Sequence, residues 1–199
     1  MNLSSQSIIF VGDTHGYWND FAKQQEIIEQ HKPDVVLSEQ LQDQVLDSPK
    51  AYARFHKHSL FSAFIRWQEF NNLVAYCEKK NISLIGIDLH DFGFDASLHD
   101  VIAGITPPTL EQERCLADIL TKRQTHQVSV INKYVSITKK PLVVLVGTWH
   151  LQEGMPLRQS FPDSLIIYPC DEKGTMLIEP PKKPLPVRYC TLPTSAPNV

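Results

Sequence analysis

Short apolar runs alternate with amphipathic stretches through most of this chain. Runs of Val, Ile and Leu without polar interruption are typical of strands that are buried on both faces of a parallel sheet. Runs of this kind predict strands at residues 8–11, 35–37, 82–87 and 142–146.

The stretches between these runs have the spacing of helices. Asn19 or Asp20 can cap a helix that ends near residue 30, and Pro49 can open a second helical region. Thr109 and Gln112 fit the capping-box pattern at the start of a long helix. The predicted helices cover residues 20–30, 61–80 and 110–136, with a further helical region from about residue 47.

The C-terminal part of the chain has a different pattern. Residues 164–168 and 175–179 are predicted to form an antiparallel pair at a sheet edge. The last twenty residues contain six prolines, which favours an extended tail. We therefore expect a mixed, largely parallel α/β sheet flanked by helices, with an antiparallel edge hairpin near the C-terminus. We expect one domain at residues 1–179 and a Pro-rich tail at residues 180–199.

Every predicted parallel strand ends in ionisable side chains. An acid directly after a buried strand costs several kcal/mol unless it is paired. Open α/β sheets bind their ligands at the carboxyl ends of the strands. The side chains at these ends are Asp13 and His15, Glu39, Asp88 with His90, and His150.

Two of these strand ends share a motif. The motif is a short apolar run followed by Gly, two residues and His, as in Ser7-Ile-Ile-Phe-Val-Gly-Asp-Thr-His15 and Leu142-Val-Val-Leu-Val-Gly-Thr-Trp-His150. A single His after a strand is more often structural, but the repeat favours a site. We expect His15 and His150 to face one cavity together with Glu39. Trp149 is expected either to line this cavity or to serve as a packing residue.

Imidazole nitrogens beside a carboxylate suit a divalent metal such as Mn²⁺, Co²⁺ or Zn²⁺. A metal held by His15, Glu39 and His150 would activate water for hydrolysis, and the same residues without metal could do acid–base work. Asp13 and Asp88 would then support the imidazoles, with His90 close by. Structural roles for Asp88 and His90 remain an alternative.

Composition narrows the class of protein. The net charge of −3 gives no footprint for nucleic acid. No apolar run approaches the ~20 residues that span a bilayer, and the start of the chain lacks the pattern of a signal peptide. The four widely spaced cysteines favour reduced thiols in a cytoplasmic protein over disulfides. A homo-oligomer is compatible with this composition.

The motifs resemble those of the TraB/PrgY–Tiki–ChaN–erythromycin esterase superfamily. Its members pair an early Gly-x-x-His with a late one, as Gly12-Asp-Thr-His15 and Gly147-Thr-Trp-His150 do here. Between them lies a Pro-Asp-x-Val-x-x-Glu strand, matched by Pro33-Asp-Val-Val-Leu-Ser-Glu39. The resemblance covers roughly residues 7–169. It implies a pocket around both histidines and Glu39, and a metal-dependent hydrolase that cleaves an ester or peptide bond of a small-molecule or peptide substrate.

Two alternatives remain open at this point. ChaN-like members of the same superfamily bind haem, so the histidines could serve a non-catalytic haem- or ligand-binding module. Gly12-Asp-Thr-His-Gly16 also resembles the opening motif of calcineurin-like metallophosphoesterases. The Gly-Asp-x-x-Asp and Gly-Asn-His motifs that complete their two-metal site are missing from this sequence.

Overall fold

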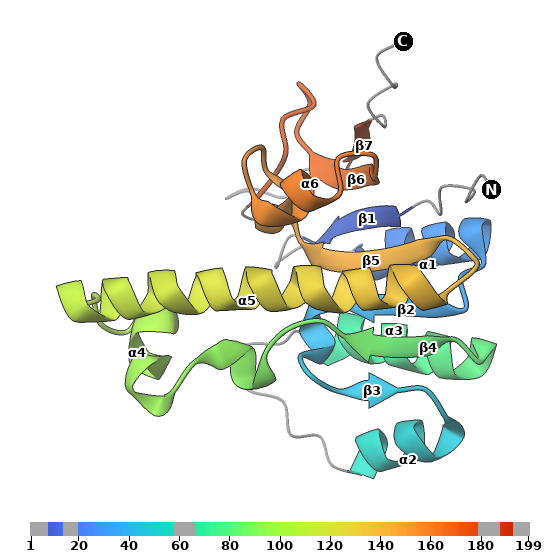
Figure 1. Cartoon of the computed structure of the whole chain (residues 1–199), viewed down its shortest axis with the longest axis horizontal. Coiled ribbons are helices and arrows are strands. Elements are labelled where there is room, and N and C mark those ends of the chain that lie inside the picture. The colour runs from blue at the N-terminus through green and yellow to red at the C-terminus, as the bar shows by residue number, and fades with distance from the viewer. Residues whose placement is uncertain (1–7, 14–19, 58–66, 179–187, 193–199) are drawn as a thin grey trace.

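The computed structural model describes residues 8–13, 20–57, 67–178 and 188–192. In this part of the chain, seven strands form one sheet in the order β3-β4-β2-β5-β1-β6-β7 (Figure 1). The five inner strands run parallel, and β3 and β7 pair antiparallel at the two edges. The strands are β1 Ile8–Asp13, β2 Val35–Ser38, β3 Val45–Leu46, β4 Ser83–Gly86, β5 Leu142–Gly147, β6 Leu165–Cys170 and β7 Arg188–Leu192.

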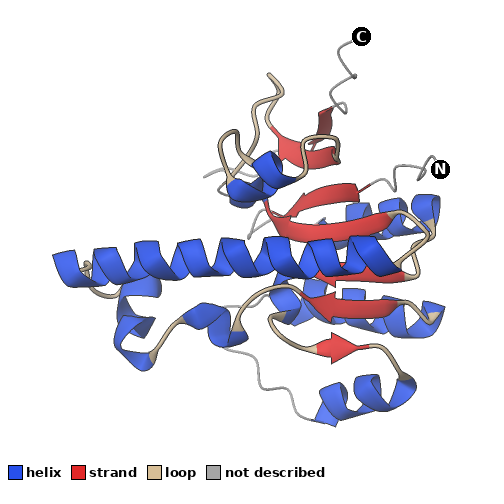
Figure 2. Cartoon of the chain, in the orientation of Figure 1, coloured by secondary structure: helices blue, strands red, loops and turns tan. Residues whose placement is uncertain are grey.

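Helices cover both faces of this sheet (Figure 2). The α-helices are α1 Asp20–His31, α2 Pro49–Lys57, α3 Trp67–Lys80, α4 His99–Ile102, α5 Leu110–Ile137 and α6 Pro156–Ser160. Short 3₁₀ turns are η1 Glu39–Leu41, η2 His90–Gly93, η3 Ala96–Leu98 and η4 Thr148–Leu151. Among these helices, none combines the length and apolarity needed to cross a bilayer.

Alternation along the strands divides the core into two layers. Ile9 and Val11 of β1 pack with apolar side chains of α1 and α3 on one face. Ile8 and Phe10 pack on the other face, where α5 contributes Ile131 and α6 contributes a buried leucine. The apolar runs are buried on both sides for this reason, and the predicted mixed, largely parallel α/β fold is confirmed.

Several predicted boundaries are close to the observed ones. The long helix begins after Thr109, whose hydroxyl accepts from the Gln112 backbone N–H while the Gln112 side chain accepts from the Thr109 N–H. The capping box is therefore confirmed. The predicted helix at residues 61–80 corresponds to α3, and its first six residues lie outside the described residues.

The antiparallel edge hairpin has a different second strand from the predicted one. Residues 175–178 form no strand and contribute only an isolated bridge between Met176 and Cys170. The partner of β6 is β7, which lies within the stretch predicted to be an extended tail. A short half-exposed edge strand between proline-rich segments carries too little apolar periodicity to be recognised.

The pairing of β6 with β7 also changes the expectation for the cysteines. Tyr168 lies opposite Cys190 in this register, and Cys170 and Cys190 form a disulfide with Cα atoms 5.9 Å apart. The prediction of reduced thiols is wrong for these two residues, because it lacked the strand that brings them together. Cys77 and Cys115 are free thiols, and burial raises the pKa of Cys77 to about 12.

Gly86 at the end of β4 allows the loop after η1 to lie directly against the sheet. A Cβ atom at this position would lie 2.0 Å from the Gln42 carbonyl oxygen. The Gly86 N–H donates to the Gln44 carbonyl, and the Asp88 N–H donates to the Gln42 carbonyl. These bonds fix the loop that follows Glu39, so Gly86 contributes to the position of that acid.

Gly86→Ala is therefore expected to reduce the free energy of unfolding by about 3 kcal/mol or more, because rigid backbone occupies the space for a methyl group. Urea denaturation measures the loss. Gly104→Ala is the matched control: its Cβ meets nothing within 4 Å and only its φ of +71° is unfavourable, which costs about 1 kcal/mol. Equal losses in the two variants would contradict the close approach.

Candidate functional site

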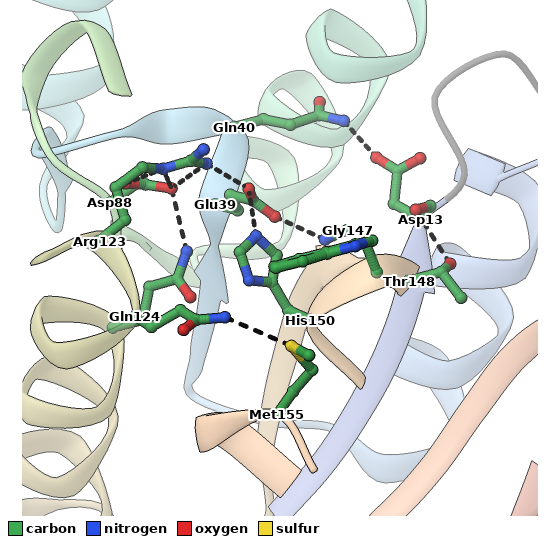
Figure 3. Close-up of polar contacts among 12 residues, drawn as sticks. Asp13, Glu39, Gln40, Asp88, Arg123, Gln124, Gly147, Thr148, His150 and Met155 are labelled. Atoms are coloured by element: carbon green, nitrogen blue, oxygen red, sulfur yellow. Dashed lines mark hydrogen bonds and ion pairs between the residues drawn. The ribbon is translucent and has the colours of Figure 1, made fainter. Parts of the chain in front are cut away.

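The central position of β5 brings the polar strand ends together. Strand β5 lies between β1 and β2, and Asp13 pairs with Gly147 in the β1–β5 register. Glu39 begins η1 directly after β2, and His150 lies in η4 directly after β5. Parallel strands end at the same edge of a sheet, so these side chains converge there (Figure 3).

Glu39 and His150 form a buried pair at this edge. The His150 Nε2 atom lies 3.2 Å from Glu39 Oε1, and both side chains are 5% exposed. A carboxylate only accepts hydrogen bonds, so the neutral imidazole carries its proton on Nε2. Its Nδ1 atom is then the basic nitrogen. Nδ1 is buried and has no hydrogen-bond partner among the described residues.

Two glycines of the repeated motif create room for these contacts. A Cβ atom on Gly147 would lie 3.2 Å from Glu39 Oε2, and the Gly147 N–H donates to that oxygen at 2.5 Å. A Cβ atom on Gly12 would lie 2.8 Å from Thr148 Oγ1, whose hydroxyl donates to the Asp13 carbonyl at 3.0 Å. The motif therefore needs glycine because polar groups of neighbouring segments approach the backbone closely.

Arg123 of α5 links two buried acids. Its Nη2 atom lies 2.7 Å from Glu39 Oε1 and 2.7 Å from Asp88 Oδ2, and its Nε atom donates to both Asp88 oxygens at 3.0 Å. Burial alone would lower the pKa of Arg123, but the hydrogen bonds and charges of Asp88 and Glu39 outweigh it and raise the pKa above its ordinary value. The guanidinium therefore remains charged and fixes Glu39.

Sequence reasoning missed Arg123, although a signal for it exists. The inward face of α5 has Ile119, Gln127 and Ile131 buried at intervals of four or eight residues. Arg123 occupies the remaining position of that stripe. A charged residue and a glutamine within an apolar helix stripe indicate a buried polar partner, but the partner could not be identified without the strand order.

Asp88 and His90 have different contacts from those expected. Asp88 is fully buried and binds Arg123 and the Gln127 amide, which donates at 3.0 Å, rather than an imidazole. The His90 side chain is 74% exposed, and its Nδ1 atom lies 3.6 Å from a carboxylate oxygen of Asp43. Asp88 therefore acts on Glu39 through the guanidinium, whereas His90 lies on the surface.

Three expected site residues remain, and the structure describes two of them, Asp13 and Trp149. His15 lies outside the described residues. Asp13 is buried, and its carboxylate accepts a hydrogen bond from the Gln40 side chain. The Trp149 ring packs edge-on against the His150 ring, with centroids 5.1 Å apart.

A cavity of about 490 Å³ lies beside Glu39 and His150. This volume lies within the ordinary range of small-molecule sites, about 300–1,000 Å³. Its polar wall lies at the sheet edge and its apolar wall comes from the loop after β4, α4, α5 and the segment after β6. The lining residues are Asp13, Glu39, Gln40, Phe92, Phe94, Ile102, Leu120, Arg123, Gly147, Thr148, Trp149, His150 and Ile178.

The described donors do not fit the expected divalent metal. Oε1 of Glu39 already accepts from Arg123 and His150, and Oε2 accepts from the Gly147 N–H. A metal at Oε1 would lie beside a guanidinium that is held by two carboxylates, and like charges repel. Among the residues that the structure describes, no three His, Cys, Asp or Glu side chains gather as a metal site.

Haem ligation would need an accessible imidazole nitrogen. In His150, Nε2 faces Glu39 and Nδ1 is buried. An axial role would therefore require this side chain to leave its pair with Glu39, or the groups that enclose Nδ1 to make room for a porphyrin ring, which is much larger than a water molecule. The haem alternative stays a prediction, and a Soret band that appears on titration and is lost in His150→Ala would support it.

Comparisons with known proteins give limited similarity. No protein-family model and no curated protein matches the chain. Two solved structures are similar in shape at 12% identity: a bacterial protein toxin, with a TM-score of 0.46, and RRSP, a MARTX toxin effector domain from Vibrio vulnificus CMCP6, with a TM-score of 0.45. The matches cover 90% and 89% of this chain but only 37% and 36% of those chains.

Proposed function

We propose that this chain is a hydrolase that cleaves an ester or peptide bond of a small-molecule or peptide-like substrate by activating water at Glu39 and His150. The observation that carries the proposal is the imidazole held by a buried carboxylate at the wall of a cavity, with its second nitrogen unpartnered among the described residues. The paired Gly-x-x-His motifs support membership of the TraB/PrgY–Tiki–ChaN–erythromycin esterase superfamily.

The unpartnered nitrogen supports a role as general base. A buried polar atom without a partner costs roughly 1–3 kcal/mol, so a water molecule or substrate group is expected to bind at Nδ1. As the water oxygen attacks the carbonyl carbon, Nδ1 takes its proton, and Glu39 stabilises the positive imidazolium. When the intermediate collapses, the imidazolium returns the proton to the departing alkoxide or amine. The products are a carboxylic acid and an alcohol or amine.

The surroundings of Glu39 support a role in orientation. Arg123, His150 and the Gly147 N–H all donate to its two oxygens, which fixes the carboxylate. A fixed carboxylate holds the imidazole in one tautomer and one position, as in the triads of hydrolases. Arg123 and Asp88 are positioning residues in this scheme.

A panel of p-nitrophenyl esters and fluorogenic peptides tests the proposal. We expect purified wild-type protein to hydrolyse at least one member faster than His150→Ala. Equal rates for the two proteins across the whole panel would remove the proposal.

Metal removal is expected to leave this activity within about twofold of its original value, because the described carboxylate oxygens are occupied by N–H donors. The measurement compares hydrolysis before and after dialysis against EDTA, and again after adding Mn²⁺, Co²⁺ or Zn²⁺. Loss of activity with EDTA and recovery with one metal would contradict this expectation and support the metal centre that the sequence predicts.

A further inference from the structure

The cavity beside Glu39 and His150 has an apolar wall that the proposed reaction does not use. Its members are contributed by several separate elements rather than by one core layer. They are Phe92, Phe94, Ile102, Leu120 and Ile178. Ile178 is 43% exposed, and the other four are half-buried. Half-buried apolar side chains around a concavity lose further water contact when an apolar group fills it.

The two phenylalanines are held in place by a constrained loop. Asp91, Phe92 and Gly93 all have positive φ values, of 47°, 54° and 74°. A left-handed aromatic residue is unfavourable and persists only where its surroundings enforce it. The Asp91 N–H donates to Gln42 Oε1 at 2.8 Å, which anchors the loop next to η1.

The Arg123 guanidinium fixes the rings from the other side. It lies 5.1 Å from the centroid of the Phe92 ring and 5.8 Å from that of the Phe94 ring. These are cation–π distances. The Arg123 guanidinium, which positions Glu39, therefore also positions the two aromatic rings. The position of the apolar wall relative to the reacting side chains is fixed as a result.

The charges at the polar end disfavour an anionic ligand. Asp13 and Glu39 line the cavity, and Asp88 lies buried behind Arg123. Arg123, the cation of the described lining, is already paired with Glu39 and Asp88. Among the described residues, a carboxylate or phosphate that entered would meet more negative than positive charge, and the low dielectric of a partly buried site strengthens that repulsion.

We infer that the substrates are neutral esters or amides with an apolar or aromatic acyl group, which packs on Phe92, Phe94 and Ile178 while the carbonyl lies at His150. This inference rests on the proposed function, because it assumes that the bound ester or amide is hydrolysed. The preference for neutral apolar ligands is a property of the cavity wall and is tested separately by binding.

The binding test uses two ligands that cannot be hydrolysed. Octan-2-one and octanoate have similar chains, but only the second is anionic. By calorimetry, we expect octan-2-one to bind wild-type protein at least about tenfold more tightly than octanoate. Phe94→Ala should weaken octan-2-one binding about fivefold to tenfold, because part of an aromatic contact is lost.

Two further variants make this test specific. Ile178 is 43% exposed, so Ile178→Ala is expected to leave the fold intact. This variant should weaken octan-2-one binding about threefold. Ile105→Ala is the matched control, because Ile105 is 70% exposed and is not part of the cavity lining, so its affinity should equal that of wild type. Octanoate binding as tightly as octan-2-one, or unchanged affinity in both Phe94→Ala and Ile178→Ala, would overturn the inference.

Kinetics separate this inference from the proposed function. We expect kcat/KM to be at least about tenfold higher for p-nitrophenyl octanoate than for p-nitrophenyl acetate, and Phe94→Ala to remove most of that ratio. Binding of octan-2-one without hydrolysis of any ester would contradict the proposed function but leave the inferred ligand preference intact. Hydrolysis with the same kcat/KM for both esters, in wild type and in Phe94→Ala alike, would contradict this inference but not the proposed function.

Discussion

His150→Ala is expected to lower kcat for ester hydrolysis by about 10²–10⁴, because the variant loses the group that takes a proton from water. The measurement is the initial rate on the best substrate of the panel, with circular dichroism to verify folding. His90→Ala is the matched control, because the His90 side chain is 74% exposed and lies outside the cavity lining. Its rate should equal that of wild type.

Glu39→Gln distinguishes an oriented base from an isolated histidine. Glutamine preserves the size of the side chain but removes the negative charge that stabilises the imidazolium, so kcat should fall by roughly 10²-fold or more. KM should change little if Glu39 acts on His150 rather than on the substrate. A wild-type rate in Glu39→Gln would show that the buried pair is structural.

Much of the fold follows from local patterns. Apolar runs predict four of the five inner strands, β1, β2, β4 and β5, because strands buried on both faces have few polar residues. The positions of Glu39 and His150 at strand ends followed from the same pattern. Their contact needed one further fact, the place of β5 between β1 and β2. Strand order depends on packing over the whole chain, which local patterns do not encode.

The parts that sequence reasoning missed depend on contacts between distant segments. Arg123 lies 84 residues from Glu39 and 35 from Asp88, so its role appears only after α5 packs on the sheet. β7 pairs with β6 across a proline-rich segment, and the disulfide depends on that pairing. The assignment of Asp88 to an imidazole also failed here, since the guanidinium occupies its oxygens.

Arg123→Met is expected to reduce the free energy of unfolding by about 3–5 kcal/mol, because removing one member of a buried ion pair leaves uncompensated charge. Asp88 is fully buried, and the Glu39 side chain is 5% exposed, so neither can regain full hydration. Urea denaturation followed by circular dichroism measures the loss. Arg114→Met on the exposed face of the same helix is the control, with an expected change within about 0.5 kcal/mol.

The double variant Arg123→Met/Asp88→Asn tests whether unpaired charge is the cause. The side-chain amide that replaces the Asp88 carboxylate carries no charge. Its oxygen can still accept from the Leu89 N–H, and its NH₂ group can donate to Gln127 Oε1, which has no partner among the described residues. Glu39 keeps its contacts with His150 and the Gly147 N–H. The double variant should therefore recover about half of the lost free energy of unfolding relative to Arg123→Met alone. Greater instability in the double variant would mean that Arg123 acts through packing on Phe92 and Phe94 rather than through its charge.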